Sequence, residues 1–250
     1  MKDTKFSPKG ITGLAAHSRR LRAQWDEKRA ELKPDQATLR SWRQGVEWER
    51  KGIHLSATVF AVWTFYVQEP LATLVLAVTT LFGLTVDFYR VRSRRWALWF
   101  YKALPFVFRV DERRTFTGAS ILMVGITLTS ALFPAVPATA GILCLIWGDS
   151  AAALVGQYFQ QRRRLRQRPG TQARAAVRAR RQKTLAGTLG CWFVSMFMVF
   201  LCVGPWPAVI IIGGLTAALL ERWTPGQWDN LTIPLATAGI VKLGLTWWPS

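Results

Sequence analysis

Residues 137–156 read PATAGILCLIWGDSAAALVG, an apolar run that a single carboxylate, Asp149, interrupts near its end. A run of this length and composition is typical of a helix that crosses a bilayer, for which about 17 to 25 residues are needed. Carboxylates are costly beside hydrocarbon and are usually functional there. The stretch therefore predicts a membrane-spanning helix with a cation site at one face of the membrane.

Apolar runs of similar length recur along the chain. Half of the 250 residues are hydrophobic, and they fall in blocks rather than in amphipathic periods. We therefore expect an all-α, polytopic integral membrane bundle with about seven spans. The predicted spans are 53–68, 70–86, 116–133, 137–156, 185–203, 205–220 and 231–248. An eighth apolar stretch, 96–108, is short, contains Lys102 and has basic residues on both sides, which favours an interfacial helix.

The first 45 residues differ from the rest because they are polar and charged. They contain no short apolar stretch with a cleavage site, so we expect no signal peptide, and the first span would act as the targeting signal. The predicted organisation is a basic cytosolic extension, 1–45, followed by a membrane-embedded domain, 46–250.

The charge of the chain is strongly one-sided, with 33 Lys and Arg against 14 Asp and Glu and a net charge of +19. Nucleic-acid binding would be the usual interpretation for a soluble protein. Here the basic residues flank the spans, most densely in 157–184, whereas the predicted outer connections 68–70, 134–137 and 204–207 contain no Lys or Arg. This pattern predicts a cytoplasmic N-terminus, in a bacterial inner membrane or its equivalent. We expect membrane lipids as partners and no nucleic acid.

The predicted topology gathers the acidic residues at span ends on the cytoplasmic face, together with several basic ones. Mg²⁺ binds oxygen ligands, usually one or two carboxylates with phosphate oxygens and waters. Phosphoryl transfer mainly requires positioning and neutralisation of phosphate charge. The face therefore predicts a site for a magnesium nucleotide. The carboxylates are Asp87, Asp149, Glu221 and Asp229, and the basic residues are Arg50, Lys51, His54, Arg90 and Lys183.

The same residues also allow structural interpretations. Glu47 and Lys51 have the i,i+4 spacing of an ion pair on a helix surface. Asp87 and Arg90 have the spacing of an ion pair at a helix end. Lys242, inside the last predicted span, is interpreted as the partner of an acid across the bundle.

Five short motifs occur in order and together resemble the CTP-dependent lipid kinases, which include dolichol kinase, yeast-type diacylglycerol kinase and phytol kinase and are related to phosphatidate cytidylyltransferases. The resemblance covers about residues 46–245. The family pattern Lys-Thr-x-Glu-Gly-Ser is matched at 183–188 except that Ala186 and Thr188 replace the Glu and the Ser. The motifs are Glu47-x-x-Arg50-Lys51-x-x-His54, Asp87-x-x-Arg90, Gly148-Asp149-x-x-Ala152-x-x-x-Gly156, Lys183-Thr184-x-x-Gly187, and Glu221 followed by Asp229-Asn230.

The resemblance implies that 46–250 is a catalytic domain. It would transfer the γ-phosphoryl group of CTP, with Mg²⁺, to the hydroxyl of a polyprenol, a phytol-like alcohol or diacylglycerol at the cytoplasmic face. The implied catalytic residues are Asp149, Lys183, His54 and Asp87, and the implied metal ligands are Asp149, Glu221 and Asp229. The implied nucleotide- and phosphate-binding residues are Arg50, Lys51, Arg90, Gly148, Thr184, Gly187 and Asn230.

Two other functions remain open from the sequence. A phosphatidate cytidylyltransferase-like enzyme would use the same site to make a CDP-lipid, but such enzymes carry further Asp-rich signature residues near the C-terminus. This chain has only Asp229-Asn230 after Pro225-Gly226, which favours the kinase. A transporter or a non-enzymatic scaffold is the other alternative. Transporters often show inverted repeats and midplane charges. No repeat is evident here, and the charges gather on one face, with Lys242 inside the last predicted span as the exception.

Overall fold

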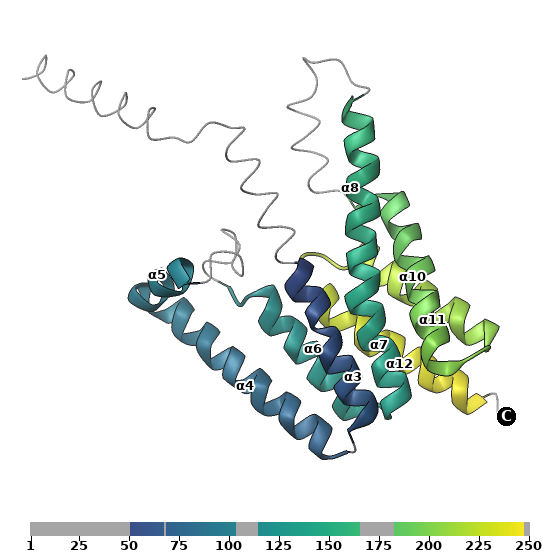
Figure 1. Ribbon diagram of the computed structural model, residues 1–250, viewed down its shortest axis with the longest axis horizontal. Helices are drawn as coiled ribbons and strands as arrows, with labels where there is room; N and C mark the ends of the chain where they lie inside the picture. The colour runs from purple at the N-terminus through teal and green to yellow at the C-terminus, as the bar shows by residue number, and fades with distance from the viewer. Residues whose placement is uncertain (1–50, 68, 104–114, 166–182, 248–250) are drawn as a thin grey trace, which may run out of the picture. The chain divides into compact units, whose positions relative to one another are not determined.

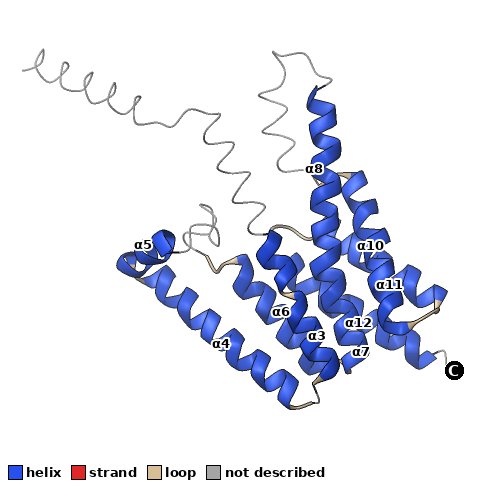
Figure 2. Ribbon diagram, in the orientation of Figure 1, coloured by secondary structure: helices blue, strands red, loops and turns tan. Residues whose placement is uncertain are grey.

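The computed structural model describes residues 51–67, 69–103, 115–165 and 183–247, and the regular structure in these ranges is entirely helical (Figures 1 and 2). The predicted all-α class is therefore confirmed for the described part of the chain. The predicted extension 1–45, residues Glu47 and Arg50, and most of the basic loop 157–184 lie outside the described residues.

The helices follow the predicted apolar runs with small shifts at their ends. Helical residues 51–56 precede the first labelled helix and are separated from it by a turn at Ala57. The labelled helices are α3 Thr58–Tyr66, α4 Leu71–Arg92, α5 Arg94–Ala103, α6 Gly118–Leu132, α7 Ala135–Leu143, the π-helix η2 Cys144–Gly148, α8 Asp149–Leu165, α10 Leu185–Val203, α11 Pro207–Trp223 and α12 Asp229–Trp247.

Length and composition identify helices that can cross a membrane. Three described helices qualify, namely Leu71–Arg92, Ala135–Arg162 and Leu185–Val203, and Gly118–Leu132 is a shorter apolar helix. The chain is accordingly an integral membrane protein. The total of seven spans and their orientation remain predictions.

The stretch predicted as an interfacial helix forms α5 up to Ala103, and its last residues, 104–108, lie outside the described part. The backbone is extended at Ser93, which ends α4 and starts a new helix direction. Trp96 and Trp99 are both more than half exposed. Exposed tryptophans directly after an apolar helix are typical of a membrane interface.

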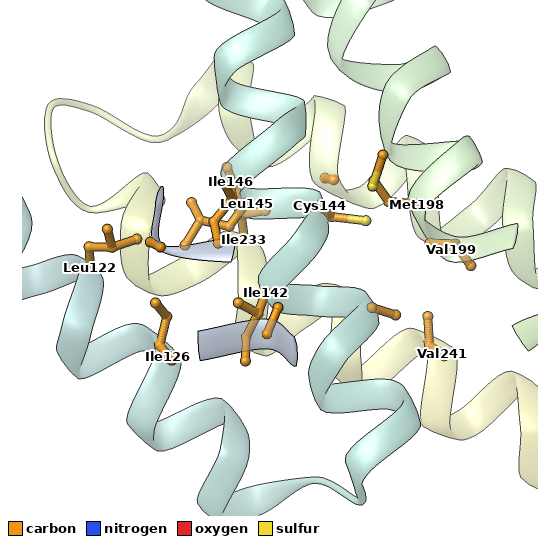
Figure 3. Close-up of a cluster of buried hydrophobic side chains, with 14 of the residues drawn as sticks. Leu122, Ile126, Ile142, Cys144, Leu145, Ile146, Met198, Val199, Ile233 and Val241 are labelled. Carbon is orange, nitrogen blue, oxygen red and sulfur yellow. The ribbon is translucent and has the colours of Figure 1, made fainter. Parts of the chain in front are cut away.

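The buried core surrounds α7 and η2, which lead into α8 without a break (Figure 1). Ile142, Leu145 and Ile146 are fully buried there. They pack with side chains of α6, α10 and α12, including Ile126 and Ile233 (Figure 3). This central position places Asp149, the next residue after η2, where the core ends.

Helix α4 is joined to α6 through polar side chains. Thr73, Thr80 and Asp87 are spaced seven residues apart, so they lie along one face of α4. We call these contacts the polar seam. Its pairs are Thr73 Oγ1 with Ser130 Oγ at 3.0 Å, Thr80 Oγ1 with Thr127 Oγ1 at 2.7 Å, and Asp87 Oδ2 with Ser120 Oγ at 2.7 Å.

Candidate active site

Asp149 is held at the junction between η2 and α8. Its side chain is 29% exposed, and its Oδ2 lies 3.9 Å from Lys51 Nζ and 3.8 Å from His54 Nε2. Both distances are longer than a hydrogen bond, so the attraction between the Asp149 carboxylate and the Lys51 ammonium group is electrostatic. A carboxylate that is both partly accessible and close to positive charge is suited to bind a cation or to accept a proton.

The π-helix before Asp149 is fixed by close packing on α10. A methyl group on Gly148 would lie 2.5 Å from Ser195 Oγ and 3.1 Å from Cys191 Sγ, so only glycine fits without movement. Ser150 Oγ donates to the main-chain oxygen of Ile146 at 2.7 Å. The predicted phosphate-binding residue Gly148 thus has a packing role, and a π-helix inside an α-helix often marks a functional site.

Lys183, just before α10, lies among oxygen atoms of the segment from Glu221 to Asp229. Its Nζ donates to the main-chain oxygen of Glu221 and lies 3.3 Å from the main-chain oxygen of Thr224. The carboxylate atoms Asp229 Oδ2 and Glu221 Oε1 lie 3.3 Å and 3.4 Å away. We call these four oxygens the oxygen cage. It joins the ends of α10, α11 and α12.

Glu221 and Asp229 belong to the connection between the last two predicted spans, and both are buried. Burial raises the pKa of the Glu221 carboxyl, which the positive charge of Lys183 opposes and the negative charge of Asp149 reinforces. Burial also raises the pKa of Asp229, again reinforced by Asp149 and opposed by Lys183. The negative charge of Asp149 therefore acts on both acids, which couples the three carboxylates electrostatically.

These carboxylates fit the oxygen ligands of a divalent cation. Glu221 Oε2 is buried and has no hydrogen-bond partner, which is costly unless a ligand satisfies it. No group of three or more His, Cys, Asp or Glu in the described ranges has the arrangement of a complete metal site. A magnesium ion that arrives with a nucleotide needs only one or two carboxylates, because phosphates and waters supply the rest.

Asp87 and Arg90 form a buried ion pair at the end of α4. Arg90 Nε donates to Asp87 Oδ1 at 2.7 Å. The other oxygen, Oδ2, lies 2.7 Å from the main-chain nitrogen of Thr117 and within 2.8 Å of the hydroxyls of Thr117 and Ser120. These contacts fit the structural interpretation of the pair, which fastens the start of α6. The implied roles of Asp87 in catalysis and of Arg90 in phosphate binding stay predictions.

Three more residues of the implied nucleotide site make structural contacts. Thr184 caps α10, because its Oγ1 accepts from the main-chain nitrogen of Gly187 at 3.0 Å. Gly187 faces α8, where an added methyl group would lie 2.6 Å from the oxygen of Ala152. Asn230 Nδ2 donates to the oxygen of Gly118 at 3.2 Å. Their contact with a nucleotide stays a prediction.

Lys242 lies away from these groups. Its ammonium group is 5.9 Å from the centre of the Phe133 ring, a cation–π contact, and the described contacts include no acid partner for it. The acid partner predicted from the sequence is therefore not seen in the described part of the chain.

Three side chains that contact the predicted residues are not among those predicted from the sequence, namely Thr117, Ser120 and Ser195. The first two form part of the cap of α6, and a Thr before an apolar run is a recognisable capping signal. Ser195 lies inside an apolar span and reaches the π-helix because α10 packs against η2 in the folded protein. It has no signal in the sequence.

Comparisons with known proteins show that the chain is a distant homologue of lipid kinases. It is 23% identical over 226 residues to the CTP-dependent diacylglycerol kinase 1 of Schizosaccharomyces pombe, covering 82% of this chain and 97% of that protein. It is 32% identical over 114 residues to the phytol kinase of a Synechocystis species, covering 44% of this chain and 46% of that protein. An uncharacterized protein of Rickettsia prowazekii is 28% identical over 200 residues, covering 76% and 90%.

No family model matches the chain, and no solved structure matches it significantly. The relatives nevertheless establish distant homology to CTP-dependent diacylglycerol kinase and phytol kinase, within the CTP-dependent lipid kinase family. The resemblance inferred from the five motifs is thereby confirmed.

Proposed function

We propose that this protein is a membrane-embedded kinase that transfers the γ-phosphoryl group of CTP to the hydroxyl of a membrane lipid alcohol. The observation that carries the proposal is the pairing of Glu221 and Asp229 with Lys183 where apolar helices end, with the negative charge of Asp149 acting on both carboxylates. The homology to lipid kinases supports the reaction class. The named relatives act on diacylglycerol and phytol, and both alcohols are candidate acceptors along with polyprenols.

In the proposed reaction the lipid hydroxyl oxygen attacks the γ-phosphorus. A new oxygen–phosphorus bond forms, the bond to the oxygen that bridges the β- and γ-phosphorus breaks, and CDP leaves. The hydroxyl proton passes to a base. Asp149 is the candidate for this base because it is the more accessible of the site's carboxylates, at 29% side-chain exposure against 7% for Glu221 and 12% for Asp229.

The neighbouring basic groups would hold the phosphates. Lys51 Nζ and His54 Nε2 both face Asp149 Oδ2, so an anion bound beside Asp149 would lie within their reach. Glu221 and Asp229 are the candidate ligands for Mg²⁺, with Asp149 as a third. Bound Mg²⁺ would neutralise charge on the phosphates.

The direct test is product analysis of the purified protein with CTP labelled at the γ position and a panel of lipid alcohols. Label in the lipid supports the kinase. Label only in pyrophosphate, with cytidine in the lipid, would instead identify a cytidylyltransferase. Replacing CTP by ATP in parallel reactions determines the donor. No product with any donor or acceptor would favour a scaffold.

A further inference from the structure

The atoms around Lys183 Nζ resemble a cation site more than an ordinary ion pair. The oxygen cage consists of two main-chain carbonyl oxygens and two carboxylate oxygens, all from one short segment, 221–229. Mixed carbonyl and carboxylate oxygens are the ligands that hard divalent cations use in proteins. An ammonium group has only three N–H donors, so it cannot fully satisfy four oxygens.

A fifth oxygen of the same residues is left over. The Glu221 side chain is 93% buried, and Oε1 of its carboxylate faces Lys183. The other oxygen, Oε2, is buried and has no hydrogen-bond partner. Leaving a buried carboxylate oxygen without a partner costs free energy. The cage therefore offers more oxygen ligands than the lysine uses.

Two cations cannot share this space. A divalent ion within the oxygen cage would repel an ammonium group at the same place, in surroundings where charges are poorly screened. Lys183 can leave because its side chain is 31% exposed and its residue precedes the first turn of α10. Once outside, its charge would lie beside any phosphate that enters with the cation.

We infer that Lys183 occupies the divalent cation site when no nucleotide is bound and is displaced from it when Mg²⁺ enters. Lysine thus acts as a stand-in cation that keeps the two carboxylates of the oxygen cage together when no nucleotide is bound. The inference rests on the proposed function only in identifying the ion as Mg²⁺. It assigns Lys183 two successive positions, first among the carboxylates and then toward phosphate.

The first experiment measures Mn²⁺ binding by electron paramagnetic resonance, without nucleotide or lipid. Lys183→Met removes the competing charge from the oxygen cage, so Mn²⁺ should bind about tenfold more tightly or better than to the wild-type protein. Arg222→Met is the matched control. Arg222 is adjacent to Glu221 in sequence but its Nη1 lies 3.4 Å from Thr188 Oγ1, outside the cage, and its loss should leave Mn²⁺ affinity nearly unchanged.

The second experiment uses the wild-type protein and so does not depend on whether a variant folds. Amine acylation followed by mass spectrometry should label Lys183 several-fold faster in the presence of Mn²⁺, because the displaced ammonium group becomes accessible. Unchanged or slower labelling of Lys183, or Mn²⁺ affinity that is equal or weaker in Lys183→Met, would overturn the inference. Neither measurement involves phosphoryl transfer, so loss of the proposed kinase function would leave both results standing.

Discussion

Asp149 and Asp87 both lie near the ends of apolar helices, but their surroundings give them different roles. Asp149 is partly exposed, and its Oδ2 lies 3.9 Å from Lys51 Nζ and 3.8 Å from His54 Nε2, beyond hydrogen-bond distance. Asp87 is buried, with both oxygens occupied by Arg90 and the start of α6. Exchange of each carboxylate for the amide of similar shape therefore separates reactivity from structure.

The Asp149→Asn variant should lose activity while remaining folded. Removal of a positioned proton acceptor or charge typically lowers kcat by about 10²- to 10⁴-fold. The apparent melting temperature should stay close to that of the wild-type protein, because the side chain is not part of a closed hydrogen-bond network. The assay is transfer of γ-label to lipid, with melting followed on the same sample. Near-normal turnover would exclude Asp149 as the base.

The Asp87→Asn variant should behave in the opposite way and lose stability first. It leaves the buried Arg90 guanidinium without its charged partner, and breaking a buried ion pair costs about 3–5 kcal/mol. The measurement is thermal unfolding in detergent, together with activity at a temperature where the variant is still folded. A variant that melts normally but has no activity would instead support a catalytic role for Asp87.

At the scale of helices, we expect the π-helix η2 to determine where Asp149 points, because Asp149 directly follows it. Gly148→Ala should push η2 away from α10 and lower kcat by about tenfold or more, since small misplacements of catalytic groups are costly. The KM for the lipid should change little. Removing the obstructing hydroxyl in the double variant Gly148→Ala/Ser195→Ala should restore much of the activity, because Ser195 Oγ is the nearest atom to the new methyl group.

The control for this pair is Gly244→Ala, remote from the acids. A methyl group there would lie 2.6 Å from Val209 Cγ2, a similar degree of crowding. It should lower stability without a specific effect on kcat. Equal loss of kcat in Gly148→Ala and Gly244→Ala, or no recovery in the double variant, would mean that η2 does not position Asp149.

Helices of this kind are predictable from the sequence, but their irregularities are not. The apolar runs predicted α4, α6 and α10 because composition alone decides whether a helix is stable in hydrocarbon. The π-helix is invisible in such a pattern, since one extra residue in a turn changes no composition. Ser195 contacts η2 only because two distant runs pack together.

The sequence predicts which charged residues lie on the same membrane face, but not which side chains each of them contacts. Asp149, Glu221, Asp229 and Lys183 could be assigned to one face because alternating spans return every second end to the same side of the membrane. Whether a given carboxylate is exposed or fully hydrogen-bonded depends on its neighbours from other helices. Asp87 has such neighbours, Thr117 and Ser120, and they lie 30 and 33 residues away in sequence, so no local pattern indicates the contact.

For the whole molecule, the prediction to test is topology. Seven spans with a cytoplasmic N-terminus place the C-terminus on the opposite side from the basic loop 157–184. A reporter that is active only outside the cytoplasm should therefore work when fused after Ser250 and fail when inserted at Thr171. A cytoplasmic reporter should give the reverse result. Activity of the same reporter at both positions would require an even number of spans between the basic loop and the C-terminus, instead of the three predicted.

The polar seam between α4 and α6 determines how this protein loses its tertiary structure in the membrane. Hydrocarbon surrounds an apolar helix about as favourably as a protein neighbour does, so burial alone gives α4 little reason to stay. Thr73, Thr80 and Asp87 hold it there through hydrogen bonds. Loss of these bonds would let α4 drift into the lipid with its helix intact. Damage at the seam would then separate two parts of the protein within the membrane, without unfolding either.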